Sequence, residues 1–359
     1  MHGHRAAEPA SSGRQASPCL ASIHVYPLKA GRAVDLDESL VEPWGLAGDR
    51  RWLVVDDAGR FVSQREEPAL ARVTARYLAA PAAKNLTRSS PVPADLIAVS
   101  ADGLSPLTVP VPSRHAGAEM LWVAVWGSKV CAAAAGEEAD SWFARFLGRD
   151  VRLVHLDDPT RREVDERYGA PGDRVSFADG YPLLLTCVSS LDALGRWLID
   201  DGHPPVPMNR FRPNVVVTGT AAWAEDQWRR IRIGTVTFRV VKPCGRCQVT
   251  TIDQTSARRG REPLALLGRR RRFGKQLIFG QNMIPDAPGT ILVGDPVQIL
   301  ERSAAGHPPD LPGRAIATAR GSGTAAARRA GRADGAAEHR QGLAGTPGSE
   351  SYPWTRGAY

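Results

Sequence analysis

Apolar and polar positions alternate along most of the first half of the chain, which is the pattern of half-buried β-strands. The stretch RRWLVVDDAGRFVSQRE, which starts at Arg50, has two apolar runs joined by DDAG and predicts a β-hairpin. LIAVSADGLSPLTVPVP, from Leu96, repeats this arrangement with ADG as its turn. MLWVAVWGSKVCAAAA, from Met120, predicts a strand pair that is broken at Trp126 and Gly127. The first half is therefore predicted to be rich in β-structure.

Two segments have helical rather than strand-like spacing. In GEEADSWFARFLGRD the large apolar side chains have helical spacing, and acidic residues precede them, as suits a helix N-terminus. These apolar residues are Trp142, Phe143, Phe146 and Leu147. The segment YPLLLTCVSSLDALGRWLIDDG predicts a strand and then a helix, with Ser189 or Ser190 as N-cap and Gly202 just past its end.

The later apolar segments are again strand-like. RFRPNVVVTG, WRRIRIGTVTFRVVKPC and GTILVGDPVQIL predict strands of the kind that close small barrels, with glycine at their corners. Beyond Arg302 the chain has almost no large apolar residue, so it is expected to be disordered. The sequence therefore predicts a mainly β (α+β) protein with a few helices. We expect a disordered N-terminus over 1–20, domains over 21–150 and 151–301, and a disordered tail over 302–359.

Composition narrows the class of protein. The 359 residues are 43% hydrophobic, as in a globular chain that buries a real core. The start of the chain has no continuous apolar stretch of a secretory signal, and no later run approaches the roughly 18 apolar residues of a membrane span, so we expect a cytoplasmic protein without a membrane. Five scattered cysteines indicate a reducing compartment. Part of the net charge of +8 lies in the tail, and aromatic residues do not alternate with the basic ones, so no nucleic-acid partner is expected.

The segment KPCGRCQVTTID contains the one local cysteine pattern, Cys244 and Cys247. A zinc ribbon needs a second pair of ligands at similar spacing, and the sequence has none. A thioredoxin-like dithiol needs a helix after the pair, whereas QVTTID is β-branched and strand-like. Two interpretations stay open on residue chemistry alone: two buried cysteines at a turn, or one thiolate that binds a soft metal whose other ligands come from a cofactor.

Several motifs carry a family resemblance. RFRPNVVV, AEDQW, KPCGRCQVTTID, REPLALL, FGQN and GTILVGDPV follow one another in the order of the MOSC domain. IHVYPLKAGRAV and WGLAGDRRWLVVDDAGRFVSQREEP resemble the N-terminal β-barrel domain that accompanies it. Over roughly residues 20 to 301 the chain resembles the family that includes the mitochondrial amidoxime-reducing component and its bacterial relatives. The resemblance implies a MOSC N-terminal β-barrel domain over 21–150 and a MOSC β-barrel domain over 151–301.

The resemblance also implies a molybdenum–pterin cofactor (Mo-molybdopterin). Its protein ligand would be the thiolate of Cys247, the second cysteine of the motif, which would be both the metal ligand and a catalytic residue. Cys244 would be a neighbour without a coordinating role. The residues that match cofactor contacts are Lys29, Arg50, Arg212 and Asn214 for the phosphate, Arg246 and the backbone at Gly245, and, as weaker matches, Gly180 and Tyr181. Ala30 stands where the family commonly has a serine.

Asp253 follows the cysteine segment in TTID. It is a candidate catalytic residue, either orienting the loop or taking part in proton delivery. An aspartate at the end of a strand is more often a turn former, and this interpretation is favoured.

The activity that the resemblance implies is reduction of small N-hydroxylated substrates, such as amidoximes and hydroxylamines. Electrons would come from a separate donor, a ferredoxin, a flavodoxin or a reductase, since the tail has no cysteines for an iron–sulfur cluster. The basic run GRRRRFGK, from Gly268, is either a solvated loop or a surface that meets an acidic donor. We expect a monomer.

Two alternatives stay open. The cysteine could carry a persulfide for sulfur transfer; pyridoxal phosphate is associated with this role in the family only, because no aminotransferase-like domain is seen in the sequence. The protein could also be a cofactor carrier without turnover.

Overall fold

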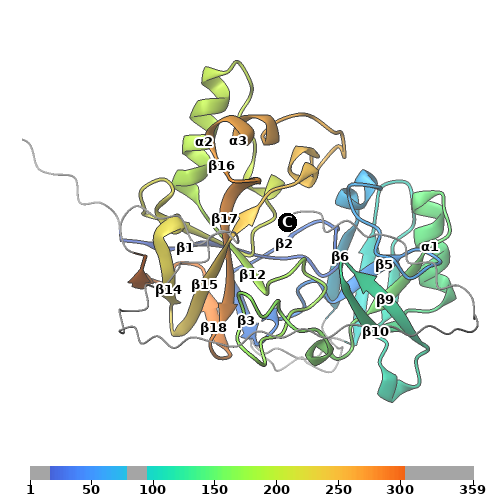
Figure 1. The fold of residues 1–359 in the computed structure, drawn as a ribbon. Helices are drawn as coiled ribbons and strands as arrows, with labels where there is room; N and C mark the ends of the chain where they lie inside the picture. The colour runs from blue at the N-terminus through green and yellow to red at the C-terminus, as the bar shows by residue number, and fades with distance from the viewer. Residues whose placement is uncertain (1–16, 79–94, 304–359) are drawn as a thin grey trace, which may run out of the picture. The chain divides into compact units, whose positions relative to one another are not determined.

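The computed structural model describes residues 17–78 and 95–303. Its largest element is a nine-stranded sheet in the order β19-β14-β15-β17-β12-β13-β1-β2, with β16 paired to β17 (Figure 1). These strands are β1 (Cys19–Val25), β2 (Val34–Leu36), β12 (Leu183–Cys187), β13 (Val215–Thr218), β14 (Trp228–Ile233), β15 (Val236–Gly245), β16 (Arg272–Phe273), β17 (Gln276–Pro285) and β19 (Val297–Arg302). The inward side chains of these strands form one large apolar core that includes Trp228, Phe238 and Met283.

The sheets cross the predicted domain boundary at residue 150. β1 pairs antiparallel with β13, with Ile23 opposite Val215, so a strand from the start of the chain lies inside the sheet of the second half. A three-stranded sheet has the order β18-β3-β4, made of β18 (Gly289–Leu292), β3 (Glu38–Glu42) and β4 (Gly45–Leu46). The boundaries of the domains stay a prediction, but β1 to β4 are structurally joined to the later strands.

The remaining strands form two sheets from the middle of the chain. One has the order β5-β11-β10-β9, made of β5 (Trp52–Val55), β11 (Arg152–His155), β10 (Ser128–Ala134) and β9 (Met120–Val125). The other has the order β6-β7-β8, made of β6 (Thr74–Leu78), β7 (Leu96–Ser100) and β8 (Leu107–Pro110). The hairpins predicted from ADG and from Trp126-Gly127 are confirmed as the pairs β7–β8 and β9–β10.

Three α-helices lie in the described residues: α1 (Glu137–Leu147), α2 (Val188–Asp200) and α3 (Leu264–Arg270). Short 3₁₀ helices are η1 (Pro68–Arg72), η2 (Arg114–Ala116), η3 (Pro159–Arg161), η4 (Met208–Arg210), η5 (Ala224–Gln227) and η6 (Gln248–Thr251). Helix α1 confirms the prediction and ends at Gly148, whose φ of 68° closes the last turn. Helices α2 and α3 pack through Leu198 and Leu267 into one apolar cluster.

The predicted start of α2 was wrong by two or three residues. The N-cap is Cys187 rather than Ser189 or Ser190. Ser190 does not cap, because its hydroxyl donates a hydrogen bond of 2.9 Å to Oε2 of Glu225 and accepts one from the backbone N–H of Trp223. A tertiary contact therefore overrides the local capping preference of serine.

The mainly β class with a few helices is confirmed. The tails predicted to be disordered, 1–20 and 302–359, lie almost wholly outside the described residues. Among the helices of residues 17–78 and 95–303, none has the length and apolar character needed to cross a membrane.

Candidate functional site

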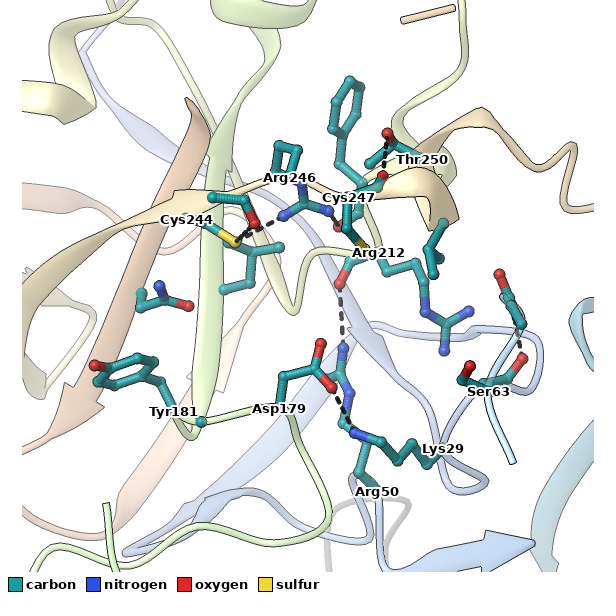
Figure 2. Close-up of a pocket in the computed structure, with 18 of the residues that line it drawn as sticks. Lys29, Arg50, Ser63, Asp179, Tyr181, Arg212, Cys244, Arg246, Cys247 and Thr250 are labelled. Carbon is teal, nitrogen blue, oxygen red and sulfur yellow. Dashed lines mark hydrogen bonds and ion pairs between the residues drawn. The ribbon is translucent and has the colours of Figure 1, made fainter. Parts of the chain in front are cut away.

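One pocket gathers nearly all the candidate site residues (Figure 2). Ten of them line it: Lys29, Ala30, Arg50, Gly180, Tyr181, Arg212, Asn214, Gly245, Arg246 and Cys247. They come from four separate parts of the chain, 29–50, 180–181, 212–214 and 245–247, and the structure brings these parts together. Cys244 also lines the pocket, whereas Asp253 does not.

Cys247 lies two residues after the end of β15, as the N-cap residue of η6. The expectation that QVTTID is strand-like was wrong, because the residues Gln248–Thr251 form this 3₁₀ turn. The hydroxyl of Thr250 donates to the carbonyl oxygen of Cys247 at 2.9 Å, and that of Thr251 donates to the carbonyl of Gln248 at 2.8 Å. Threonine side chains that bond back three residues explain why a β-branched run turns here.

Cys244 is held by Arg246. Nη1 of Arg246 lies 2.8 Å from Sγ of Cys244, and Nη2 donates a 2.5 Å hydrogen bond to the carbonyl oxygen of Phe211. Burial raises the pKa of Cys244, and the neighbouring Arg246 charge offsets only part of this effect. Cys244 is therefore a protonated thiol at neutral pH, which fits a neighbour rather than a metal ligand.

Two arginines from different halves of the chain meet over Tyr26. Cζ of Arg50 lies 4.3 Å and Cζ of Arg212 lies 4.2 Å from the centre of the fully buried Tyr26 ring. Nη1 of Arg50 donates to Oδ1 of Asn214 at 2.9 Å, and Nη1 of Arg212 donates to the carbonyl oxygen of Gly31 at 2.7 Å. Burial lowers the pKa of Arg212 to about 10, so both guanidinium groups are cationic at neutral pH. Cation–π contact and hydrogen bonds thus fix two positive charges in the pocket wall.

Lys29 forms an ion pair with Asp179 inside the pocket. Nζ of Lys29 lies 2.6 Å from Oδ1 of Asp179 and donates to the carbonyl oxygen of Phe177 at 2.7 Å (Figure 2). Burial lowers the pKa of Lys29 to about 8, and the carboxylate opposes this shift. Desolvation in the pocket disfavours the charged form of Asp179. The charge and the hydrogen bond of Lys29 outweigh this effect and hold the pKa of Asp179 below its usual range. The carboxylate of Asp179 is therefore ionised at neutral pH.

An aromatic wall faces these charges. The rings of Phe61 and Trp126 meet edge to face with centres 4.8 Å apart, and Cζ of Arg65 lies 4.3 Å from the Trp126 ring. Nε1 of Trp126 donates to Oδ1 of Asp179 at 3.2 Å. The sequence analysis missed Asp179, Trp126, Phe61 and Arg65 as site residues. The only signal was the turn at Trp126-Gly127, and a turn by itself does not indicate which site its residues reach.

Unusual backbone conformations cluster at the pocket. Six described residues other than glycine have a positive φ angle, and four of them line the pocket: Ala30 (69°), Arg50 (48°), Trp126 (55°) and Arg212 (55°). A non-glycine residue in this region costs on the order of 1–3 kcal/mol and persists where the surroundings hold it. The concentration of this strain around one cavity supports its assignment as the functional site.

Asp253 belongs to a turn outside the pocket. Its Oδ1 accepts hydrogen bonds from the backbone N–H of Ser256 at 2.8 Å and from the Ser256 hydroxyl at 2.9 Å, and its Oδ2 lies 3.3 Å from Nη2 of Arg210. These bonds, the backbone bond from Ser256 above all, lower the pKa of Asp253. The geometry is that of the favoured turn former, and a direct catalytic role for Asp253 has no support from its position.

The pocket is built to take an anion beside a thiol. Five of its lining residues are basic, Lys29, Arg50, Arg65, Arg212 and Arg246, and one, Asp179, is acidic. Nε of Arg246 is buried without a hydrogen-bond partner among the described residues, so at least one donor stays available to a ligand. In the described part of the chain no group of three His, Cys, Asp or Glu residues is arranged to hold a metal. A metal at Cys247 would therefore need ligands that a bound cofactor brings.

Ser22, His24 and Asp35 form a second constellation of catalytic residue types. Oγ of Ser22 lies 2.8 Å from Nε2 of His24, and Nδ1 of His24 lies 2.7 Å from Oδ1 of Asp35. A hydrolytic triad also needs free backbone N–H groups near the serine to bind an oxyanion. Strand β1 pairs with β13 on one edge and with β2 on the other, which commits its backbone to the sheet. We therefore assign no hydrolase chemistry to this constellation.

Comparison with known proteins identifies the family of this chain. The model of the MOSC N-terminal beta barrel domain matches residues 17–150, and the model of the MOSC domain matches residues 172–298. Mitochondrial amidoxime-reducing component 1 of Mus musculus is 31% identical, over 78% of this chain and 82% of that protein. The chain belongs to the MOSC-domain family. The resemblance inferred from the motifs is confirmed.

Relatives within the MOSC family have two different names. Mitochondrial amidoxime-reducing component 1 of Homo sapiens is 30% identical, over 78% of this chain and 82% of that protein. Molybdenum cofactor sulfurase of Homo sapiens is 28% identical, over 81% of this chain but only 33% of that protein. One name refers to amidoxime reduction and the other to the molybdenum cofactor. The activity of this MOSC protein therefore has to be argued from its own pocket.

Proposed function

We propose that Cys247 is the protein ligand of a molybdenum–pterin cofactor and that this protein reduces N-hydroxylated compounds such as amidoximes and hydroxylamines. The observation that carries the proposal is a cysteine in a pocket with five basic side chains and one acidic one. A thiolate suits a soft transition metal, and clustered arginine and lysine side chains suit a phosphate. The similarity to amidoxime-reducing components supports this choice at the level of the family.

The donor set fits the cofactor. Lys29, Arg50 and Arg212 would hold its phosphate, with Asn214 fixing Arg50 from behind at 2.9 Å. Arg246 and the backbone at Gly245 would contact the pterin, since both line the pocket beside Cys247. Ala30 offers no hydroxyl, and its carbonyl oxygen already accepts a 2.6 Å hydrogen bond from Nε2 of Gln64. Ala30 therefore provides one side-chain contact fewer to the cofactor, while the contacts from the charged side chains would remain.

When bound, such a cofactor would supply the two-electron chemistry that removes the oxygen of an N–OH group as water. The residues of the chain supply a proton and a surface for the substrate. Nζ of Lys29, with a pKa of about 8, can release a proton near neutral pH, and Oδ1 of Asp179, 2.6 Å away, accepts its hydrogen bond and positions it. The rings of Phe61 and Trp126 form a wall on which a flat amidoxime can stack.

The test uses protein made in a host that synthesises the cofactor. We expect molybdenum and pterin fluorescence close to one equivalent per chain, and benzamidoxime reduction with reduced methyl viologen as donor. Cys247→Ser should lose molybdenum and turnover, while the matched variant Cys244→Ser should keep both. Wild-type protein with neither metal nor pterin, or a Cys247→Ser variant with full turnover, would refute the proposal.

The same experiment separates the two alternatives. Molybdenum and pterin without turnover would indicate a cofactor carrier. A persulfide on Cys247, seen as one extra sulfur in the mass of its peptide, would indicate sulfur transfer, the activity suggested by the similarity to molybdenum cofactor sulfurase. A cytoplasmic location and a monomeric state stay predictions.

A further inference from the structure

One segment of the chain carries a large net positive charge. Residues 258–275 contain eight basic residues and one acidic residue, a formal charge of +7, whereas the whole chain carries +8. The segment is not a simple solvated loop. It includes helix α3 and strand β16, and Arg271 is buried in an ion pair of 2.6 Å with Asp226.

Four arginines of this segment line an open groove on the surface: Arg259, Arg261, Arg269 and Arg272. All four are exposed. Arg269 contacts Asp201, and Nε of Arg272 donates to the carbonyl oxygen of Gly268 at 3.1 Å. Arg261 makes no ion pair within the described residues. The groove therefore presents cationic groups that the chain itself neutralises only in part.

The groove and the pocket lie on two sides of the same turn. Gln248 and Thr251 of η6 line the groove, whereas Val249 and Thr250 of η6 line the pocket together with Cys247. Leu277 also lines the groove, and its carbonyl oxygen accepts a 2.7 Å hydrogen bond from the backbone N–H of Arg246. A molecule seated in the groove is thus separated from Cys247 by a single four-residue 3₁₀ helix.

We propose that this groove, lined by Arg259, Arg261, Arg269 and Arg272, is the docking surface for a small acidic electron-transfer protein that delivers electrons to the pocket through η6. The inference rests on the proposed reductase function. Removal of oxygen from R–NHOH consumes two electrons and two protons and yields R–NH2 and water. A one-electron carrier such as a [2Fe–2S] ferredoxin is therefore oxidised twice in each turnover.

Charge and surface chemistry favour an acidic protein over a nucleic acid. Complementary charge steers association and orients a transient complex. Binding of single-stranded nucleic acid commonly uses aromatic side chains on which the bases stack. Among the residues that the structure describes, no aromatic side chain lines the groove.

The test compares two electron donors in cofactor-loaded protein. The variant Arg261→Glu/Arg272→Glu reverses two charges of the groove, and Lys129→Glu/Arg145→Glu is the matched control, because Lys129 and Arg145 are exposed and belong to β10 and α1. With reduced plant-type [2Fe–2S] ferredoxin at low salt, we expect kcat/KM for the ferredoxin to fall at least about tenfold in the groove variant and to stay within about twofold in the control. With reduced methyl viologen, both variants should match the wild type.

Binding of oxidised ferredoxin to cofactor-free protein gives a second readout. The dissociation constant should rise with ionic strength in the wild type and less steeply in the groove variant. Equal ferredoxin-dependent rates in wild type and groove variant would overturn the docking surface while leaving the reductase intact. No viologen-driven rate in the wild type would instead refute the proposed function. Loss of single-stranded RNA binding in the groove variant, with ferredoxin kinetics unchanged, would reassign the groove to nucleic acid.

Discussion

Gln64 and Gln254 face each other as a buried amide pair, in which Nε2 of each side chain donates to Oε1 of the other at 3.1 Å. The two residues are 190 positions apart in the chain. Gln64 also donates to the carbonyl oxygen of Ala30 at 2.6 Å, and Oε1 of Gln254 accepts a hydrogen bond from Arg212 at 3.2 Å. The pair therefore fixes two pocket residues from behind, one from each half of the sequence.

The first prediction concerns this pair. Gln64→Ala removes the two hydrogen bonds that Gln64 exchanges with the buried amide of Gln254, so the free energy of unfolding should fall by about 1–3 kcal/mol, at roughly 1 kcal/mol per hydrogen bond. The double variant Gln64→Ala/Gln254→Ala should cost less than the sum of the two single variants, because each single variant already removes the same two hydrogen bonds between the amides. Urea unfolding of the four proteins measures the coupling. Strict additivity would show that the pair does not act as a unit.

The second prediction concerns the pH dependence of ligand binding at Lys29. Its pKa of about 8 means that the pocket loses a positive charge as the pH rises through this value. Retention of the phosphate-bearing cofactor should therefore weaken between pH 7 and pH 9 in the wild type. Lys29→Arg keeps its charge over this range, so its retention curve should be flat. Pterin release, followed by fluorescence after gel filtration at each pH, makes the comparison, and identical curves would remove Lys29 from the anion site.

The third prediction concerns stability at Glu225, which is fully buried next to α2. Burial, with a smaller contribution from Asp226, raises the pKa of Glu225 from 4.5 to about 7. Between these two pH values the folded state binds more protons than the unfolded state. The contribution of Glu225 to the free energy of unfolding is therefore fully present below pH 4.5 and is lost as the pH rises to 7. The loss is about 3 kcal/mol for a shift of this size.

Glu225→Gln isolates this effect, because a glutamine can still accept the hydrogen bond that Ser190 donates. Urea midpoints at pH 5 and pH 8 should differ more in the wild type than in the variant. A wild type and a variant with the same pH dependence would mean that Glu225 is ionised throughout.

The fourth prediction separates the two roles considered for Asp253. Asp253→Asn should lower the free energy of unfolding by about 1 kcal/mol, because the turn to Ser256 loses its charge-assisted hydrogen bonds. Turnover with benzamidoxime and methyl viologen should stay close to that of the wild type. A fall in kcat of about a hundredfold or more would instead indicate proton delivery by this carboxylate.

Local signals in the sequence predicted the local structure well. The β7–β8 and β9–β10 hairpins and helix α1 follow from alternation, turn residues and helical spacing, which act between near neighbours. The pairing of β1 with β13 has no such signal, since strand register across a long separation is set by tertiary packing. QVTTID differs for a local reason, because its threonine hydroxyls bond to carbonyl oxygens three residues back and override the preference for a strand.

The residues of the candidate site also divide into those that the sequence predicts and those that only the structure reveals. Residues within recognisable motifs, such as Lys29 in YPLKAG and Cys247 in KPCGRC, were found and line one pocket. Asp179 and Trp126 were missed because their importance comes from meeting Lys29 and each other across the pocket. Asp253 illustrates the opposite case, because its place after the cysteine motif suggested chemistry while its contacts are those of a turn.

The pairing of β1 with β13 also constrains how the protein is made. As the ribosome releases the chain, Ile23 and Val25 of β1 can pair early with β2, but the other edge of β1 has no sheet partner until β13, which begins at Val215, has been synthesised. Such non-local pairing delays completion of the sheet, because the long intervening chain has to close first. Tyr26 follows β1 directly, and its ring positions both Arg50 and Arg212. The anion site needs Arg212 as well as this ring, so it can form only after both halves of the chain have been synthesised, and insertion of the proposed cofactor would have to follow.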